Sequence, residues 1–262
     1  MKAILRVPFV AACLALMQVA PGQTPPDTTA PSRTFRGTVQ LTNNGISLVP
    51  SFSLNRPALL ALMAVGGKRF TFEPDLRIGL DGKPWSALFW FRYRAVRRSR
   101  FSLRVGAHPA LNFRTLDYGD DVDTGPREVI EARRFLAAEL VPSWRLGEPW
   151  SVGGYYLYGR GFDNSQRVSH FAVANVGLAR VPLGERLDLS VYPNAYYLVL
   201  DELDGWYASA TVRVGLREKP WSVSAVANQT IDTEILPEQR FVWNVALEWS
   251  FRQEYVPLRL PL

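Results

Sequence analysis

Charged side chains recur at every second position of several long apolar segments. In residues 69–80, Arg69, Glu73 and Arg77 fall on one face of an extended strand, because successive side chains of a strand point to opposite sides. Guanidinium groups stay charged and bind carboxylate or phosphate in a bidentate manner, so an interior that they line would favour anions. The candidate interior residues are Arg69, Glu73, Arg77, Arg92, Arg104, His108, Asn112, Arg133, Arg213, Glu248 and Arg252, and a wider set adds Arg94, Arg114, Glu131, Glu139 and Arg160.

The arginine content of the chain is high. Only Lys2, Lys68, Lys83 and Lys219 are lysines, which leaves 26 arginines among the 30 basic residues. The codon usage of a GC-rich genome explains such an excess without any function. The two functional interpretations are a pore lined by guanidinium groups and a closed interior in which arginine and glutamate neutralise one another.

The two histidines raise the question of a hydrolase. A serine nucleophile needs its base within hydrogen-bond reach, yet no serine lies two residues from His108 or His170 on the same strand face. The His108-Pro109 pair also lacks the local pattern of the outer-membrane phospholipases, which carry a serine, histidine and asparagine site. We therefore expect no enzyme and no catalytic residues, and a lipid-modifying hydrolase remains an alternative.

Metal and cofactor sites have weak support. Cys13 is the only cysteine, so thiolate metal sites are not expected in a mature chain. Asp117, Asp120, Asp121 and Asp123 cluster in residues 115–127 and could share a calcium ion, but their spacing matches no established calcium loop. A solvated acidic loop explains them better, and we expect no metal and no cofactor.

The dominant period of the sequence is two. In residues 101–113 the apolar side chains of Phe101, Leu103 and Val105 begin a series that alternates with Ser102 and Arg104. Such segments run to about eleven to thirteen residues, twice a usual globular strand, whereas a tilted strand needs about nine to eleven residues to cross a bilayer. Length and a charged inner face therefore favour a membrane barrel over a soluble sandwich.

About twelve strands are expected, an even number that closes without edges. The fold class is accordingly all-β, a transmembrane antiparallel up-and-down β-barrel. The expected strands are residues 46–54, 58–65, 69–80, 85–95, 101–113, 128–144, 150–161, 168–181, 187–199, 206–216, 221–231 and 241–251. The longest connection, residues 115–127, is expected to face the outside of the cell.

Three connections share a proline followed by tryptophan and serine. Proline ends a strand without leaving an amide unpaired, and tryptophan favours the boundary between membrane and water. Trp85, Trp150 and Trp221 are therefore predicted to form a girdle at one rim. Counting strands from the C-terminus conflicts with this prediction, because it puts the turn before Trp85 at the opposite rim from the other two.

The beginning of the chain has the order of a secretory signal peptide. Lys2 and Arg6 precede an apolar run that ends in small residues, with cleavage expected after Ala20 or Gly22. The predicted organisation is a signal peptide at 1–22, a flexible periplasmic segment at 23–44, and the barrel at 45–262. The net charge of +6 is too small to argue for nucleic acid as a partner.

Residues 45–54, 106–113 and 241–251 resemble uncharacterised outer-membrane β-barrel proteins of Bacteroidota-type bacteria. The resemblance implies the barrel fold and an outer-membrane location, and no site residues. We expect a monomer whose partners are outer-membrane lipid and lipopolysaccharide, the barrel-assembly machinery and small solutes. The expected function is a narrow porin-like channel for small, anionic solutes, and a closed structural or adhesin-like barrel is the other alternative.

Overall fold

The computed structural model describes residues 33–47, 52–121, 125–163, 166–236 and 240–255. The prediction of a signal peptide at 1–22 lies outside these residues. The described chain consists of twelve strands with the following bounds: β1 Arg33–Thr42, β2 Ala58–Gly66, β3 Phe70–Gly79, β4 Pro84–Arg97, β5 Phe101–Asp121, β6 Gly125–Gly147, β7 Trp150–Gly161, β8 Val168–Leu183, β9 Leu187–Leu200, β10 Leu203–Leu216, β11 Trp221–Thr233 and β12 Phe241–Tyr255.

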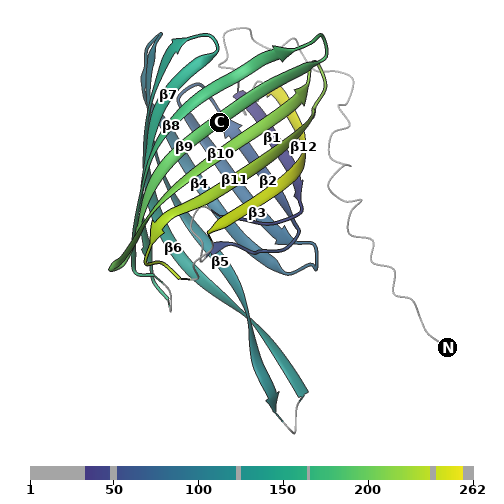
Figure 1. The fold of residues 1–262 in the computed structure, drawn as a ribbon, viewed down its shortest axis with the longest axis vertical. Helices are drawn as coiled ribbons and strands as arrows, with labels where there is room; N and C mark the ends of the chain where they lie inside the picture. Colours follow the sequence, from purple (N-terminus) through teal and green to yellow (C-terminus); the bar gives the residue numbers. More distant parts are fainter. Residues whose placement is uncertain (1–32, 48–51, 122–124, 164–165, 237–239, 256–262) are drawn as a thin grey trace, which may run out of the picture.

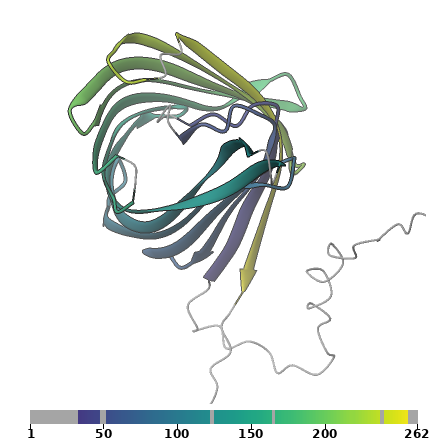
Figure 2. The ribbon, with the colours of Figure 1, turned by 90° about the horizontal axis from the view of Figure 1, so that it is seen from below.

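Each strand pairs with its sequence neighbours, and β1 pairs with β12 to close the barrel (Figures 1 and 2). All twelve pairs are antiparallel; in the closing pair Arg33 lies opposite Tyr255 and Thr42 opposite Ala246. Closure gives every strand two hydrogen-bonded neighbours, so no sheet edge is left open. The expected fold class and number of strands are confirmed.

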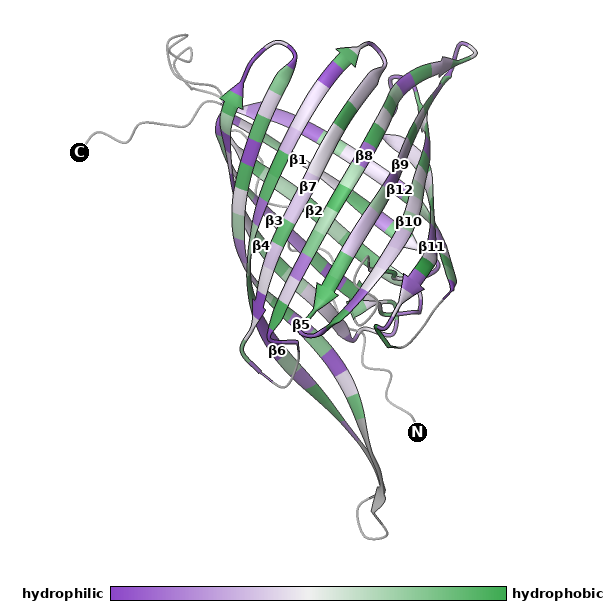
Figure 3. Cartoon of the chain, turned by 60° about the vertical axis from the view of Figure 1, so that its left-hand side comes forward, coloured by the Kyte–Doolittle hydropathy of each residue, from purple (hydrophilic) through white to green (hydrophobic). Residues whose placement is uncertain are grey.

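Alternation separates the two surfaces of the barrel. In β12, Trp243, Leu247 and Trp249 point outward and are 39–52% exposed, whereas Ala246 and Glu248 between them are buried inside. Hydrophobic and hydrophilic residues alternate along many of the strands in Figure 3. The outer surface is therefore apolar and the interior carries the polar side chains, the arrangement of a barrel that spans a membrane.

The N-terminal part of the barrel differs from the prediction. Residues 33–42 form β1, so the flexible segment predicted at 23–44 is wrong for these residues and the barrel begins before residue 45. Phe35, Val39 and Leu41 alternate with polar residues in β1, but glycine and threonine weaken the signal. The strand predicted at 46–54 is absent from the described residues of that range.

Residues 43–57 instead form the connection between β1 and β2. Its described ends are held together, because the amide of Leu54 donates to the carbonyl of Gly45 over 2.8 Å and the amide of Gly45 donates to Arg56 over the same distance. Phe52 contacts Phe135 of β6, with ring centroids 5.1 Å apart. This segment lies across part of the barrel opening in Figure 2.

The two rims differ in their connections. The beginning of β1 and the end of β12 lie at one rim, here the terminal rim, together with the turns before Trp150 and Trp221. The turn before Trp85 lies at the opposite rim, as the strand count requires, so the proline-tryptophan turns are not specific to one side. The opposite rim also carries the 43–57 connection and the connections after β7 and β11.

Residues 115–127, expected as a loop, are mostly strand. β5 and β6 extend 21 and 23 residues and remain paired from Phe101 opposite Trp144 to Asp121 opposite Gly125. Their far ends project beyond the opposite rim as a long hairpin (Figures 1 and 3). Within the described residues, no helix is long and apolar enough to cross a membrane.

Candidate functional site: the barrel lumen

Most of the predicted interior residues do face the lumen. The strand register puts Arg92 opposite Gly106 and Asn112 opposite Arg133, all on the inner face. The residues that face inward are Glu73, Arg77, Arg92, Arg104, His108, Asn112, Arg133, Arg213, Glu248 and, at the terminal rim, Arg252. The strands bring them together in two ionic clusters and several separate pairs.

The first ionic cluster, here the Glu139 cluster, joins β3, β4, β5 and β6. The buried carboxylate of Glu139 accepts hydrogen bonds from Nε of Arg92 over 2.8 Å and from Nε of Arg104 over 3.0 Å. Arg92 also bonds to Glu73, which accepts a hydrogen bond from Thr71 over 2.8 Å. A buried carboxylate is unfavourable in a low-dielectric environment unless it has such partners, and the two arginines stabilise it here.

The second ionic cluster, here the Glu248 cluster, lies where the barrel closes. Glu248 of β12 accepts hydrogen bonds from Gln40 of β1 over 2.8 Å, and from Ser222 and Ser224 of β11 over 2.9 and 2.6 Å. Nε of Arg213 on β10 lies 2.7 Å from the same carboxylate. One buried carboxylate therefore links four strands across the closing seam.

Further arginines are paired along the lumen. Arg77 bonds to Asp75 through two nitrogens at 2.8 and 2.6 Å, and Arg133 bonds to Glu131 at 2.8 and 2.7 Å. At the terminal rim Arg252 lies 2.9 Å from Glu254. The carboxylates offset much of the positive charge that the arginine excess suggested, and Asp75 was missing from the predicted interior residues.

Two predicted interior arginines lie elsewhere. Arg69 is an exposed residue of the turn before β3 and donates to the hydroxyl of Tyr93 over 3.3 Å, on the outer side. Arg160 pairs with Leu136, whose side chain is 51% exposed on the outer face. The prediction for Arg69 is wrong because the alternation was extended into the turn before β3. The prediction for Arg160 is wrong because Arg160 shares the outward face of β7 with Tyr156 and Tyr158.

Trp85 is not a girdle residue. Its side chain is 2% exposed, its Nε1 donates to the carbonyl of Phe52 over 2.7 Å, and Arg77 lies over its ring at 5.1 Å. A register shift beside Arg77 turns it toward the interior. Trp150 and Trp221 are 50% and 46% exposed at the terminal rim, where the girdle was predicted.

The lumen contains a cavity of about 570 Å³, here the lumenal cavity. Strands β3 to β9 and the 43–57 connection contribute its walls. The lining is mainly apolar and includes the side chains of Leu88, Trp90, Phe135, Tyr155, Leu157, Phe171 and Leu198. This volume is within the range of small-molecule pockets, which are commonly apolar with a few polar groups.

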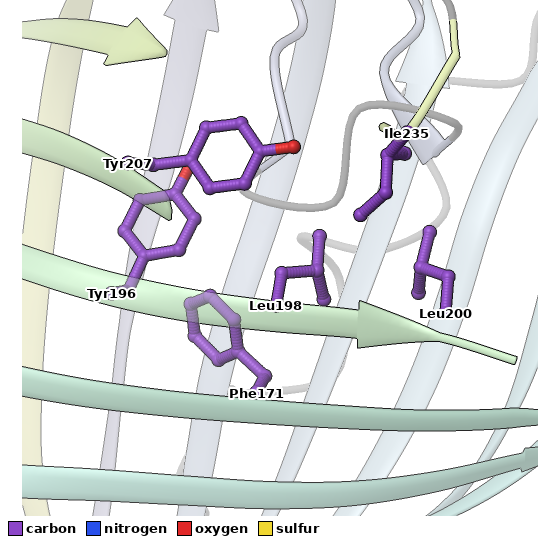
Figure 4. Close-up of a cluster of buried hydrophobic side chains, with 6 residues drawn as sticks. All are labelled: Phe171, Tyr196, Leu198, Leu200, Tyr207 and Ile235. Atoms are coloured by element: carbon purple, nitrogen blue, oxygen red, sulfur yellow. The ribbon is translucent and has the colours of Figure 1, made fainter. Parts of the chain in front are cut away.

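Part of the cavity wall is a packed apolar cluster (Figure 4). Tyr196 and Tyr207 stack with ring centroids 4.8 Å apart, and Phe171 contacts Tyr196 at 5.0 Å. Leu198 of β9 is completely buried, and Ile235 from the connection after β11 packs against the same cluster. This part of the interior, between β8 and β10, is therefore apolar and largely aromatic.

Two buried polar atoms in the cavity wall have no hydrogen-bond partner among the described residues. They are Nδ1 of His108 and Oγ of Ser86, in side chains that are 5% and 7% exposed. The His108 ring contacts the Trp90 ring with centroids 3.9 Å apart, and Arg92 lies over Trp90 at 4.1 Å. Buried groups of this kind normally find a partner, so these atoms need an explanation.

The apolar lining was missed in the sequence. Leu88 and Trp90 fall on the same strand face as Arg92, so alternation would have assigned them to the interior. The predicted interior residues were all charged or polar, so Leu88 and Trp90 were not among them. His170 faces outward, where its Nδ1 lies 2.7 Å from the hydroxyl of Tyr156, so the lumen receives only one of the two histidines.

In the described ranges, no three His, Cys, Asp or Glu side chains are grouped as a metal site would require. The predicted cluster at Asp117, Asp120, Asp121 and Asp123 lies outside the residues whose side chains are described.

Fold and lumen together define a membrane-spanning β-barrel with a partly apolar interior. No protein-family model matches the chain, and no curated protein matches its sequence. Among solved structures, the COG4313 outer membrane channel from Pseudomonas putida F1 matches with 14% identity and a TM-score of 0.47, covering 89% of this chain and all of the other. LpxR from Salmonella typhimurium matches with 12% identity and a TM-score of 0.38, covering 82% and 99%.

The prediction of no enzyme, which came from the absence of a serine close to either histidine, is wrong, because proteins of similar fold include enzymes. LpxR, one of the proteins of similar fold, is an enzyme.

Proposed function

We propose that the protein is an integral outer-membrane channel for small solutes, which pass through the lumenal cavity. The observation that carries the proposal is a closed barrel with an apolar outer surface whose interior holds about 570 Å³ of unfilled space. Small barrels without transport roles commonly fill their interior with side chains.

The outer surface supports the membrane location. Tryptophans and leucines such as Trp243, Leu247 and Trp249 are exposed in succession along one strand. A contiguous apolar surface of this kind is unfavourable in water and favourable against lipid tails. Lipid and lipopolysaccharide would therefore surround the barrel, with small solutes as the molecules that it handles.

The connections support one orientation. The terminal rim carries short turns, the beginning of β1 and the end of β12. Bacterial barrels place short turns in the periplasm. The long hairpin of β5 and β6 would then project from the cell surface, together with the 43–57 connection.

The paired arginines argue for weak charge selectivity. Arg92, Arg104 and Arg213 each contact a carboxylate, so they contribute little unbalanced positive charge to the lumen. We therefore favour a channel whose selectivity is set mainly by size and polarity, with at most a small anion preference.

Single-channel recording of the refolded chain in a planar bilayer tests the proposal. We expect a steady unitary conductance, which Ala137→Trp should lower because Ala137 lines the cavity opposite His108. Ala138→Trp is the matched control, since Ala138 lies opposite Tyr158 on the outer face and should leave the conductance unchanged. A folded barrel that never conducts, or equal effects of the two variants, would reject the proposed function.

A further inference from the structure

The lumenal cavity combines apolar walls with two unsatisfied polar atoms. His108 and Ser86 are among its lining residues, both side chains are more than nine-tenths buried, and Nδ1 of His108 and Oγ of Ser86 have no hydrogen-bond partner among the described residues. Leaving a buried polar atom without a hydrogen-bond partner costs free energy. A ligand that supplies the missing hydrogen bonds would explain both atoms.

Each arginine and aspartate side chain that lines the cavity already has an ion-pair partner. The charged side chains of its lining are Asp75, Arg77 and Arg92, apart from His108. Arg77 pairs with Asp75, and Arg92 pairs with Glu73 and Glu139. An added anion or cation would compete with these pairs and would lose its hydration in an apolar space. An uncharged ligand has neither disadvantage.

We propose that the lumenal cavity is a saturable binding site for an uncharged molecule with an apolar, aromatic body and a hydroxyl or similar hydrogen-bonding group. The body packs against Trp90, Phe171 and Leu198. The polar group bonds to His108 or Ser86; a hydroxyl suits both, because it can donate and accept. This inference rests on the proposed channel function for the ligand's route into the barrel.

The register offers a matched pair of variants. Ala137 lies opposite His108 and lines the cavity, whereas its neighbour Ala138 lies opposite Ala107 on the outer face. Tryptophan at position 137 fills the space that a ligand would occupy. The same substitution at position 138 adds the same side chain against lipid and leaves the cavity as it is.

The experiment is isothermal titration calorimetry of the full chain in lipid nanodiscs with cinnamyl alcohol and with cinnamate. The two probes share one aromatic body and differ in charge, and empty nanodiscs measure partitioning into lipid. We expect saturable binding of cinnamyl alcohol, weaker binding of cinnamate, and loss of binding in Ala137→Trp but not in Ala138→Trp. His108→Phe and Ser86→Ala should each weaken binding by about fivefold, the effect of one neutral hydrogen bond.

Several results would overturn the site. The first is a heat of injection equal to that of empty nanodiscs. The second is equal affinity for cinnamyl alcohol in Ala137→Trp and Ala138→Trp, and the third is tighter binding of cinnamate than of cinnamyl alcohol. Conductance separates this inference from the proposed function. A conducting protein without saturable binding would support the proposed channel and reject the proposed binding site. Saturable binding in a barrel that does not conduct would support the binding site and reject the channel.

Discussion

Arg92 holds the buried carboxylate of Glu139 through two nitrogens, at 2.8 and 3.1 Å, and so ties β4 to β6 across the strand between them. Arg104 of that intervening strand, β5, bonds to the same carboxylate. The arrangement explains how a barrel with an apolar cavity keeps charged side chains inside, because each of these side chains contacts a group of opposite charge.

Removing the central carboxylate should destabilise the barrel. Glu139→Ala leaves Arg92 and Arg104 without their shared partner, and we expect a loss of about 3 kcal/mol in the free energy of unfolding. Urea unfolding of the protein in lipid vesicles, followed by tryptophan fluorescence, measures this change. Glu254→Ala is the control, because the exposed Arg252–Glu254 pair should contribute under about 1 kcal/mol. Equal losses in the two variants would contradict the prediction.

The closing seam should loosen when Glu248 is changed. Glu248→Ala removes the acceptor for Gln40 on β1 and for Ser222 and Ser224 on β11. We expect Glu248→Ala to increase the rate of amide hydrogen exchange more in β1 and β12 than in β6 and β7. The reason is that the weakened pairing of β1 with β12 opens locally. Exchange that rises evenly around the barrel would show that the carboxylate is not specific to the seam.

The three tryptophans of the proline-tryptophan turns should respond differently to lipid. Trp150 and Trp221 are exposed at the terminal rim, whereas Trp85 is buried inside. With brominated lipids, Trp150→Phe and Trp221→Phe should each reduce the quenched part of the fluorescence, and Trp85→Phe should not. A loss of quenching in Trp85→Phe would show that Trp85 contacts lipid at the membrane boundary.

The connection after β7 should depend on pH. Hydrogen bonds from the side chain and amide of Arg134 lower the pKa of Asp163 from 3.8 to about 2. A lowered pKa means that this contact stabilises the connection above about pH 4 and is lost as the pH falls toward 2. Carbon-13 NMR of the aspartate carboxyl groups measures the titration, and Arg134→Gln should raise the pKa of Asp163 toward its ordinary value. An unchanged pKa in that variant would rule out Arg134 as the cause.

Alternation of side chains determined most of the fold. Eleven of the twelve predicted segments are strands of the closed barrel, and in β12 the series of Phe241, Trp243 and Val245 identified the outer face directly. The same pattern placed Glu73, Arg92 and Arg104 inside. It succeeded because a strand permits only two side-chain directions, so one apolar face assigns both faces.

The tertiary structure decided which inner residues meet. Arg92 and Glu139 are 47 positions apart, and the register between strands alone brings them into contact. Trp85 turns inward at a local register shift that the turn sequence does not reveal. The sequence by itself determined a barrel with an apolar outer face and a charged inner one. Only the tertiary structure determined how those charges pair and where an apolar cavity remains beside His108. The reason is that these contacts join side chains from strands far apart in the sequence, which meet in the same lumen.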